Sequence, residues 1–394
     1  MPIIADLHIH GKYSRATSKD LTLPNLEKYA RIKGVNLLGT GDFTQPNWFA
    51  HIKESLTERD GIHCTKTGFP FLLTSEISLI YTQDGKGRRV HNILLAPNLE
   101  VVTQITDYLK TKGRVDYDGR PIFKIPCPEF VESLRQISKD IEIIPAHFFT
   151  PHFSVFGEYN QFSKMEDCFQ DQTKHIHAIE TGLSADPAMI WRMSQLDKYS
   201  LVSFSDSHSF WPWKIGREAT IFDTELNYKD IILALKTKEG LQGTVEVDPA
   251  YGKYHWDGHR ACNTVLPPAE ARKNNNICPV CNKKLTIGVE HRVEELADRK
   301  AGFKPKDAKP YYSLLPLAEL IAAVTNKGVS TQGTTKEYYN ILKTENEFKI
   351  LLETSEQDLL KLTSKKITDA ILKNRKGEIK ISPGYDGVYG KAEL

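Results

Sequence analysis

Short apolar runs alternate with amphipathic stretches over residues 1–225 of the chain. Runs rich in β-branched and aromatic residues predict strands, and apolar residues at three- to four-residue spacing predict helices. Beyond the first apolar run, at residues 2–7, the predicted strands cover residues 35–39, 71–80, 90–95, 141–146, 178–180 and 201–204, and the predicted helices cover residues 25–33, 100–112, 128–139 and 187–197. This alternation predicts an α/β fold with helices around a largely parallel sheet, either open or closed into a barrel.

The pattern changes after residue 250. Residues 251–300 are rich in Cys, His and Asn, which is typical of a small module held together by a metal. Leu, Ile and Ala then recur at helical spacing, and a Gly- and Pro-rich tail follows at residues 381–390. We therefore expect a catalytic domain at 1–250, a zinc-binding module at 251–300, and a helical C-terminal domain at 301–394. A chain of 394 residues exceeds what one core usually supports.

Composition narrows the cellular setting. The sequence contains no apolar stretch of the roughly 18 residues that a membrane span needs, and its start lacks a signal-peptide layout. We expect a soluble cytoplasmic protein without a membrane partner. Residues 1–250 carry 28 Lys and Arg against 32 Asp and Glu, and the remainder carries 24 against 18. The acidic part suits divalent cations and the basic part a polyanion, although ordinary solvated surface explains so small a difference equally well.

Histidine and carboxylate side chains follow or interrupt nearly every predicted strand. His8 and His10 are two positions apart, so on an extended chain they point the same way, and Asp206 and His208 repeat this spacing after a later strand. Strand ends in such folds commonly meet at one face, where imidazoles and carboxylates assemble transition-metal sites. The residues that predict a metal site are His8, His10, Glu76, His91, His147, Asp206 and His208, with Asp42 at another strand end.

A second metal site is predicted by spacing alone. His259 and Cys262 are separated by two residues, as are Cys278 and Cys281, with fifteen residues between the two pairs. Four such ligands close the coordination shell of a structural zinc ion. His255 and His291 are alternatives to His259 as the fourth ligand. No disulfide framework is expected, because the remaining cysteines are isolated in the sequence.

The order His-x-His, Gly-Asp, Glu, His, His, Asp-x-His resembles the polymerase-and-histidinol-phosphatase (PHP) superfamily of metal-dependent phosphoesterases. The resemblance implies a distorted (β/α)7 barrel holding two or three divalent cations (Zn, Mn, Mg or Fe) that activate a water molecule. It implies catalytic roles for Asp206, Glu76 and His208. By the same resemblance, His8, His10, Glu76 and Asp206 share a first cation, Glu76 bridges to a second on His91 and His147, and Asp42 with His208 helps to hold a third. Many PHP proteins have His where this chain has Asp42.

Longer motifs narrow the resemblance. Residues 14–20, 38–44, 179–184, 204–213 and 383–390 are similar to the endonuclease Q family, and the similarity extends over essentially the whole chain. This implies a repair enzyme that cuts DNA on the 5′ side of deaminated bases (uracil, hypoxanthine, xanthine) or abasic sites. The implied partner is damaged double- or single-stranded DNA, within the nucleoid. A replication sliding clamp is a further possible partner, although the carboxyl end shows no convincing clamp-binding peptide.

Aromatic and cationic residues near the metal motifs suggest where a lesion is read. Trp211 and Trp213 follow the Asp-x-His pair, Phe149 follows His147, and Arg15 follows the first His pair. We expect them to line a base pocket beside a phosphate cleft, although the tryptophans equally suit packing of a loop onto the barrel. Two other functions fit the metal motif: a small-molecule phosphatase of the histidinol-phosphate kind and a non-catalytic DNA-binding protein.

Overall fold

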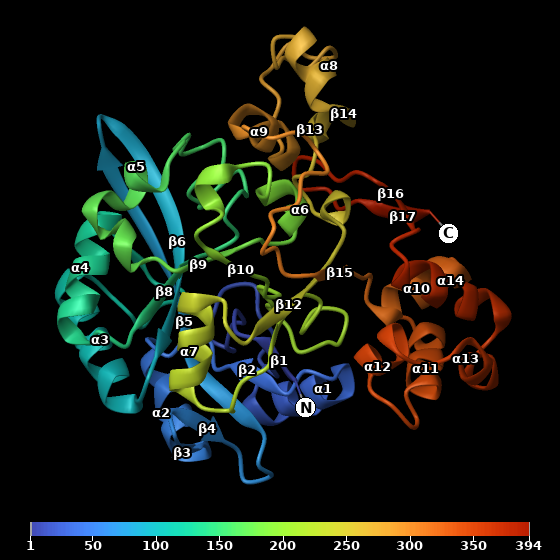
Figure 1. Cartoon of the computed structure of the whole chain (residues 1–394), viewed down its shortest axis with the longest axis horizontal. Helices are drawn as coiled ribbons and strands as arrows, with labels where there is room; N and C mark the ends of the chain where they lie inside the picture. The colour runs from blue at the N-terminus through green and yellow to red at the C-terminus, as the bar shows by residue number, and fades with distance from the viewer. Residues whose placement is uncertain (1, 394) are drawn as a thin grey trace.

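A ring of short strands forms the centre of the protein in the computed structural model, which describes residues 2–393 (Figure 1). β1 pairs in parallel with β2 and β2 with β5, whereas β6 runs antiparallel to β5 and β8. A parallel bridge between Ile9 and Ser207 joins the end of β10 to the end of β1. The ring strands are β1 (Ile3–Asp6), β2 (Leu37–Gly39), β5 (Pro70–Gln83), β6 (Lys86–Ala96), β8 (Glu142–Pro145), β9 (Ala178–Glu180) and β10 (Ser200–Val202). The predicted α/β barrel is confirmed, and the reversed strand β6 is its main distortion.

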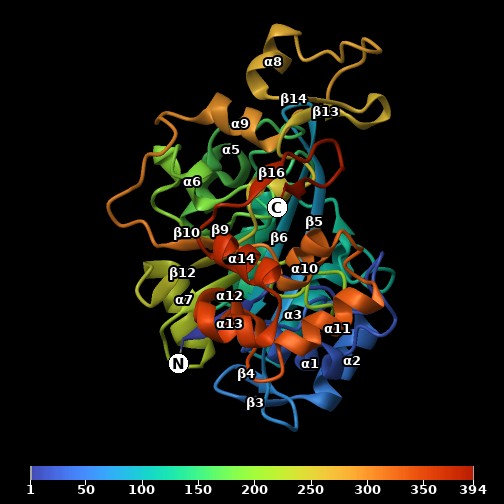
Figure 2. The same ribbon diagram turned by 90° about the vertical axis from the view of Figure 1, so that its right-hand side faces the viewer.

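Helices cover the outside of this ring (Figures 1 and 2). Their local signals are ordinary: Asn98 and Asn227 accept hydrogen bonds as N-caps, and Gly34 ends the first helix in the left-handed region with φ 96°. The apolar face of α4 buries Phe130 and Leu134. The helices are α1 (Leu23–Lys33), α2 (Pro46–Ser55), α3 (Leu99–Lys112), α4 (Cys127–Ile137), α5 (Met165–Phe169), α6 (Pro187–Ile190) and α7 (Tyr228–Thr237).

The helix predicted at residues 187–197 is wrong beyond its first turn. α6 ends at Ile190, and only a short 3-10 segment, Ser194–Leu196, follows. The carbonyl of Arg192 accepts hydrogen bonds from the amides of Asp298 and Arg299, at 3.0 and 3.1 Å. A distant segment therefore takes the backbone partner that a longer helix would have used internally.

Further strands extend the sheet on either side of the ring. β11 (Ala219–Phe222) pairs antiparallel with β1, β12 (Leu241–Glu246) continues from β11, and β15 (Tyr311–Ser313) adds in parallel to β12. β15 belongs to the segment that leads to the C-terminal helices, so these pairings fasten that segment to the barrel. Three short strands, β3 (Thr57–Arg59), β4 (Ile62–Cys64) and β7 (Ile122–Phe123), lie at the other side.

Two smaller parts lie against the barrel (Figure 1). The module at the top contains β13 (Asp257–His259), β14 (Thr264–Leu266), α8 (Pro268–Lys273) and α9 (Val289–Leu296). The helices in orange and red are α10 (Leu317–Thr325), α11 (Gln332–Ile341), α12 (Glu347–Leu352), α13 (Glu356–Leu362) and α14 (Lys365–Arg375). The tail forms a hairpin of β16 (Lys380–Ser382) and β17 (Lys391–Glu393), which lies between the module and these helices in both views. In the part of the chain described, no helix is long and apolar enough to cross a lipid bilayer.

Candidate metal centres

The ends of β1 and β10 bring the first group of predicted ligands together. His8 and His10 follow β1 with one residue between them, and the Ile9–Ser207 bridge places Asp206 beside them. The amide of His10 donates to the carbonyl of Ser207 at 3.0 Å, which fixes this register. The alternating pleat then points both imidazoles to one side, toward the barrel mouth.

Residues from the longest hairpin complete the mouth. Glu76 lies in β5 opposite Ile93, and His91 lies in β6 opposite Ser78, so the two residues lie near each other on the paired strands. His147 follows β8 directly. Asp42, His147 and Asp206 each have positive φ values, of 48°, 30° and 46°. Non-glycine residues seldom adopt this conformation, and its concentration after strands at the mouth is typical of a functional site.

The predicted ligands form two groups that share one carboxylate. His8, His10, Glu76 and Asp206 make the first group, and Glu76, His91 and His147 make the second; within each group the ligand atoms lie within 4.8 Å of one another. The Oε1 atom of Glu76 lies 2.6 Å from Nδ1 of His91, and its Oε2 atom lies 3.4 Å from Nε2 of His10. The two oxygens of Glu76 therefore face different groups, as a bridging carboxylate does.

The charges in the mouth are mutually dependent. Burial opposes ionisation of Glu76, but the positive charges of His91 and Arg120 outweigh it and hold the pKa of Glu76 well below its usual value. Burial lowers the pKa of His91 to about 4 despite the neighbouring Glu76, so its imidazole is neutral, the form that binds metals. Burial disfavours a charge on His8, yet the carboxylates around it, first that of Glu180, raise its pKa well above the ordinary value.

The donor set fits divalent cations. Nε2 of His8 is buried and has no hydrogen-bond partner within residues 2–393, while it faces carboxylate oxygens of Glu76 and Asp206 at 3.6 Å each. A buried imidazole nitrogen is normally paired, so this atom is aimed at a missing partner. An electron-pair acceptor between these atoms satisfies all of them. Mixed imidazole and carboxylate donors suit Zn, Mn or Fe better than Mg.

Supporting residues around the mouth include one that the sequence motifs did not indicate. Glu180 accepts from Nδ1 of His8 at 2.9 Å and from the amide of His147 at 2.6 Å, so one carboxylate orients both imidazole-bearing segments. Arg120 donates to Oε2 of Glu76 at 2.9 Å, and the charge of Glu76 raises the pKa of Arg120. Arg120 lies in a short irregular segment without periodicity, so no local pattern marked it.

Two predicted ligands lie beside the groups rather than within them. Asp42 is fully buried, and its oxygens accept from Nδ1 of His10 at 3.0 Å, the amide of Gly11 at 2.5 Å and the hydroxyl of Ser14 at 2.7 Å. The ring of His208 stacks on that of His10 at 4.3 Å between centroids, with Nε2 3.7 Å from Asp206. Asp42 thus orients His10, and its role as ligand of a third cation stays a prediction.

The residues predicted to read the lesion have different environments. Phe149 is 1% exposed and packs against Phe148 and Phe156 in the core, so the expectation that it lines a base pocket is corrected. Trp211 is 39% exposed and stacks on Trp213 with 5.1 Å between ring centroids and 5° between planes. The side chain of Arg15 is 77% exposed and pairs with Asp118 at 3.3 Å. Trp211 and Arg15 remain accessible to a ligand.

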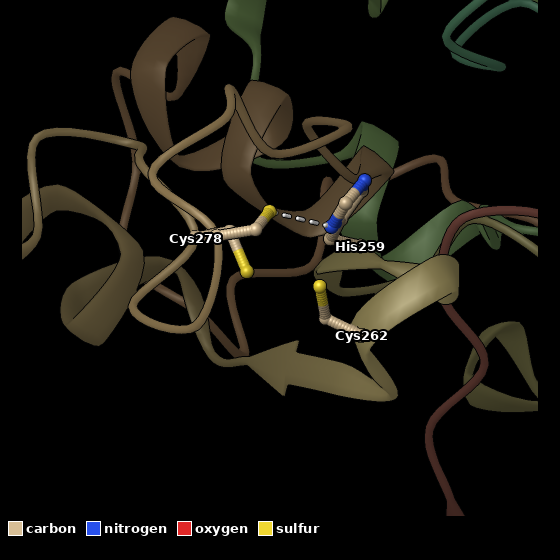
Figure 3. Close-up of side chains that lie close together, drawn as sticks. His259, Cys262 and Cys278 are labelled. Carbon is tan, nitrogen blue, oxygen red and sulfur yellow. Dashed lines mark hydrogen bonds between the residues drawn. The ribbon is translucent and has the colours of Figure 1, made fainter.

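The second predicted metal site lies in the module (Figure 3). His259, Cys262, Cys278 and Cys281 have ligand atoms within 4.8 Å of one another, and Nδ1 of His259 lies 3.3 Å from Sγ of Cys281. A hydrogen bond with Thr264 helps lower the pKa of the Cys278 thiol to about 6, which favours the thiolate that metals bind. The alternatives have other partners: His255 pairs with Glu290 at 3.4 Å, and His291 with Asp257 at 2.5 Å.

Comparisons with known proteins agree with this architecture. The family described as MJ0043 C-terminal domain matches residues 316–378. An uncharacterized protein of Methanocaldococcus jannaschii, MJ0043, is 34% identical over 250 residues, which are 62% of this chain but only 31% of that protein. The uncharacterized protein YqxK of Bacillus subtilis is 29% identical over 99% of this chain and 98% of its own length.

Two solved structures match the whole chain. The lesion-specific endonuclease PfuEndoQ of Pyrococcus furiosus is 31% identical, with a TM-score of 0.89 over 100% of this chain and 96% of that one. Endonuclease Q in complex with a 27-mer duplex bearing an abasic lesion is 32% identical, with a TM-score of 0.90 over 100% and 97%. The barrel and its mouth of imidazoles and carboxylates are those of a PHP-type phosphoesterase. Within that class, the chain belongs to the endonuclease Q family.

Proposed function

We propose that this protein is a DNA-repair endonuclease that hydrolyses the phosphodiester on the 5′ side of a deaminated base or an abasic site. The observation that carries the proposal is the match over the whole chain, with a TM-score of 0.90, to endonuclease Q bound to an abasic duplex. The paired ligand groups at the barrel mouth support it, because phosphodiester hydrolysis needs concentrated positive charge. Uracil, hypoxanthine and xanthine are the deaminated bases that we propose as lesions.

We propose that His8, His10, Glu76 and Asp206 hold one divalent cation and that Glu76 bridges to a second on His91 and His147. When bound, such cations lower the pKa of a water molecule and neutralise phosphoryl oxygens during in-line displacement. Arg120 and Glu180 then act as positioning residues, because they fix Glu76 and His8 through hydrogen bonds of 2.9 Å each. No side chain has to act as a nucleophile.

Access to a lesion base fits the exposed aromatic residues after Asp206. A base inside a duplex must leave the stack to be inspected, and aromatic faces compensate for the lost stacking. Trp211 offers one exposed face, supported from behind by Trp213. We therefore propose Trp211 as a contact to the displaced base or its neighbour and Arg15 as a phosphate contact.

We propose a structural zinc ion in the module. Three thiols and one imidazole provide four ligands, so no coordination position is left open for substrate. The module's own apolar cluster is small, comprising Ala271, Cys278 and Leu285 with three partly buried neighbours. A core of this size does not stabilise a fold without a metal or a neighbouring domain.

The direct test is strand cleavage. The purified protein should be incubated with Mn, Mg or Zn and duplexes that carry a single uracil, hypoxanthine or abasic site, with an undamaged duplex and a phosphomonoester as controls. We expect a nick 5′ of the lesion only. Asp206→Asn should reduce nicking at least about 1000-fold through loss of cation binding, whereas the matched variant of an exposed carboxylate, Asp223→Asn, should nick normally. Turnover of the monoester without nicking of lesion duplexes would reject the proposal.

A further inference from the structure

The tail is pressed against the start of the zinc-binding module by glycine contacts. A Cβ atom on Gly384 would lie 2.2 Å from the carbonyl oxygen of Gly252, and one on Gly390 would lie 2.2 Å from that of Ala250. The amides of Gly384 and Gly390 donate to the carbonyls of Ala250 and Tyr251, at 2.8 and 3.1 Å. Only glycine allows backbones to approach so closely. The position of the residue between these contacts, Tyr389, is therefore fixed on the barrel.

Three cations from separate segments surround the ring of Tyr389. Nζ of Lys253 lies 4.7 Å from the ring centroid and Nζ of Lys214 lies 5.2 Å from it. Arg217 forms a hydrogen bond with the Tyr389 hydroxyl. Tyr389 is 37% exposed, and Lys253 is also exposed, so the group faces solvent. We call Lys214, Arg217, Lys253 and Tyr389 the tail cluster.

The positive charge of the tail cluster is not neutralised locally. Within residues 2–393, no carboxylate oxygen lies within 4.0 Å of a charged nitrogen of its three cations. The acidic group nearest to its charges is Glu319, and burial raises the pKa of Glu319, which weakens its negative charge. Burial, together with the charge of Arg217, also lowers the pKa of Lys214. Partly buried cations without a counter-charge indicate that an anion binds there.

The tail cluster lies at the edge of the candidate metal mouth. The guanidinium of Arg217 donates to the carbonyl of Ser205 at 2.9 and 3.2 Å, and Ser205 immediately precedes Asp206. An anion held by Arg217 is thus close to the segment that carries a predicted metal ligand. Lysine, arginine and tyrosine side chains are typical contacts to DNA phosphate oxygens.

We propose that the tail cluster binds a backbone phosphate of DNA next to the phosphodiester that is cleaved. This inference rests on the proposed function and assigns to the carboxyl-terminal tail a role that its sequence does not disclose. Phosphate contacts carry no base information, so the tail cluster should strengthen binding to damaged and undamaged duplexes alike. Tyr389 contributes a hydroxyl donor, while the three cations supply charge.

Lys253→Gln is the sharpest test, because the side chain is exposed and its loss should not disturb folding. The dissociation constant for a lesion duplex should be measured by fluorescence anisotropy without added divalent cations, at several salt concentrations. We expect a rise of about 5- to 10-fold and a fall of about one in the slope of log K against log salt. The matched control is Lys229→Gln, an exposed lysine on α7, which should behave as the unmodified protein. An unchanged salt slope for Lys253→Gln would overturn the proposal.

Tyr389→Phe separates binding from anchoring of the tail. It keeps the ring and its cation contacts but removes the hydroxyl, so affinity should fall about 2- to 5-fold, within the range of one hydrogen bond, with no change in melting temperature. If Lys253→Gln and Tyr389→Phe lower the melting temperature and leave DNA affinity unchanged, the tail cluster only anchors the tail and the proposal is rejected. Failure of the proposed function looks different, because the unmodified protein would then bind duplexes without nicking at lesions.

Discussion

Lys33 and Glu347 form an ion pair of 2.6 Å in which the side chains are 1% and 0% exposed. Lys33 ends α1 of the barrel, and Glu347 begins α12 of the helical region, so the pair joins two parts that are 314 positions apart in the sequence. Glu347 also accepts from the amide of Leu317 and the hydroxyl of Tyr338, while Lys33 donates to the carbonyl of Pro212. This contact links the helical region to the aromatic loop beside the metal mouth.

Removal of one partner of this pair should be costly. Glu347→Gln leaves the Lys33 ammonium buried without a counter-charge, so the free energy of unfolding should fall by about 3 kcal/mol, and adding Lys33→Met should recover part of the loss. Denaturant unfolding measures both. The exposed pair of Glu356 with Lys365 provides the control: Glu356→Gln should change stability by no more than about 0.5 kcal/mol. Equal effects of the two Glu→Gln changes would contradict the role of burial.

Arg120 should control activity through Glu76. Arg120→Gln removes the 2.9 Å hydrogen bond that holds Oε2 of Glu76, so kcat/KM for a lesion duplex should fall about 10- to 100-fold with weaker cation binding. Arg120→Lys should retain part of the activity, because it keeps the charge. Arg114→Gln alters a neighbouring arginine that pairs with Asp116 on the surface and should be neutral. Cation affinity, measured by titration, should follow the same order, and an unaltered affinity in Arg120→Gln would refute the positioning role.

The module should depend on its zinc ion. Cys278→Ser should abolish the stoichiometric zinc found by elemental analysis after dialysis, and should lower the melting temperature, because the metal supplies much of the module's folding free energy. Cys64 is a free, partly exposed cysteine in β4 and lies outside the group, so Cys64→Ser serves as the control. A zinc-free Cys278→Ser protein that melts with the control would argue against a structural role.

The buried pair of His291 with Asp257 should make stability depend on pH. Burial disfavours the charged imidazole, but the hydrogen bonds with Asp257 and Glu295 outweigh this and raise the pKa of His291 to about 9. A raised pKa in the folded state stabilises the protein fully below the unfolded value, 6.5, and the contribution disappears as pH rises through about 9. The difference in melting temperature between the unmodified protein and His291→Gln should therefore be largest near pH 6 and small at pH 10. A constant difference over this range would show that His291 contributes only packing.

Strand-end chemistry was readable from the sequence because its signals are local. Two histidines one residue apart on an extended segment must point the same way, and the paired spacing of Cys278 and Cys281 is set by the geometry of a chain that turns around an ion. Both features depend on a few neighbouring residues. The barrel class follows from the alternation of strands and helices in the same local way.

Other features were out of reach because partners distant in sequence decide them. Asp42 was expected at a third cation, and in the structure it is occupied by His10, Gly11 and Ser14. Phe149 follows a predicted ligand, yet the packing of Phe148 and Phe156 places it in the core. Nothing in the local sequence around either residue records those neighbours.

The sequence by itself determined the class of fold and the chemical types available for metal binding, since periodicity and side-chain chemistry are properties of short segments. Tertiary structure alone decided how those groups are shared: that Glu76 faces two ligand groups, that Arg120 supports it, and that the tail places Tyr389 among cations from two other segments. The physical reason is that these contacts join residues far apart along the chain. They exist only once the barrel has closed and its side chains compete for the same buried partners.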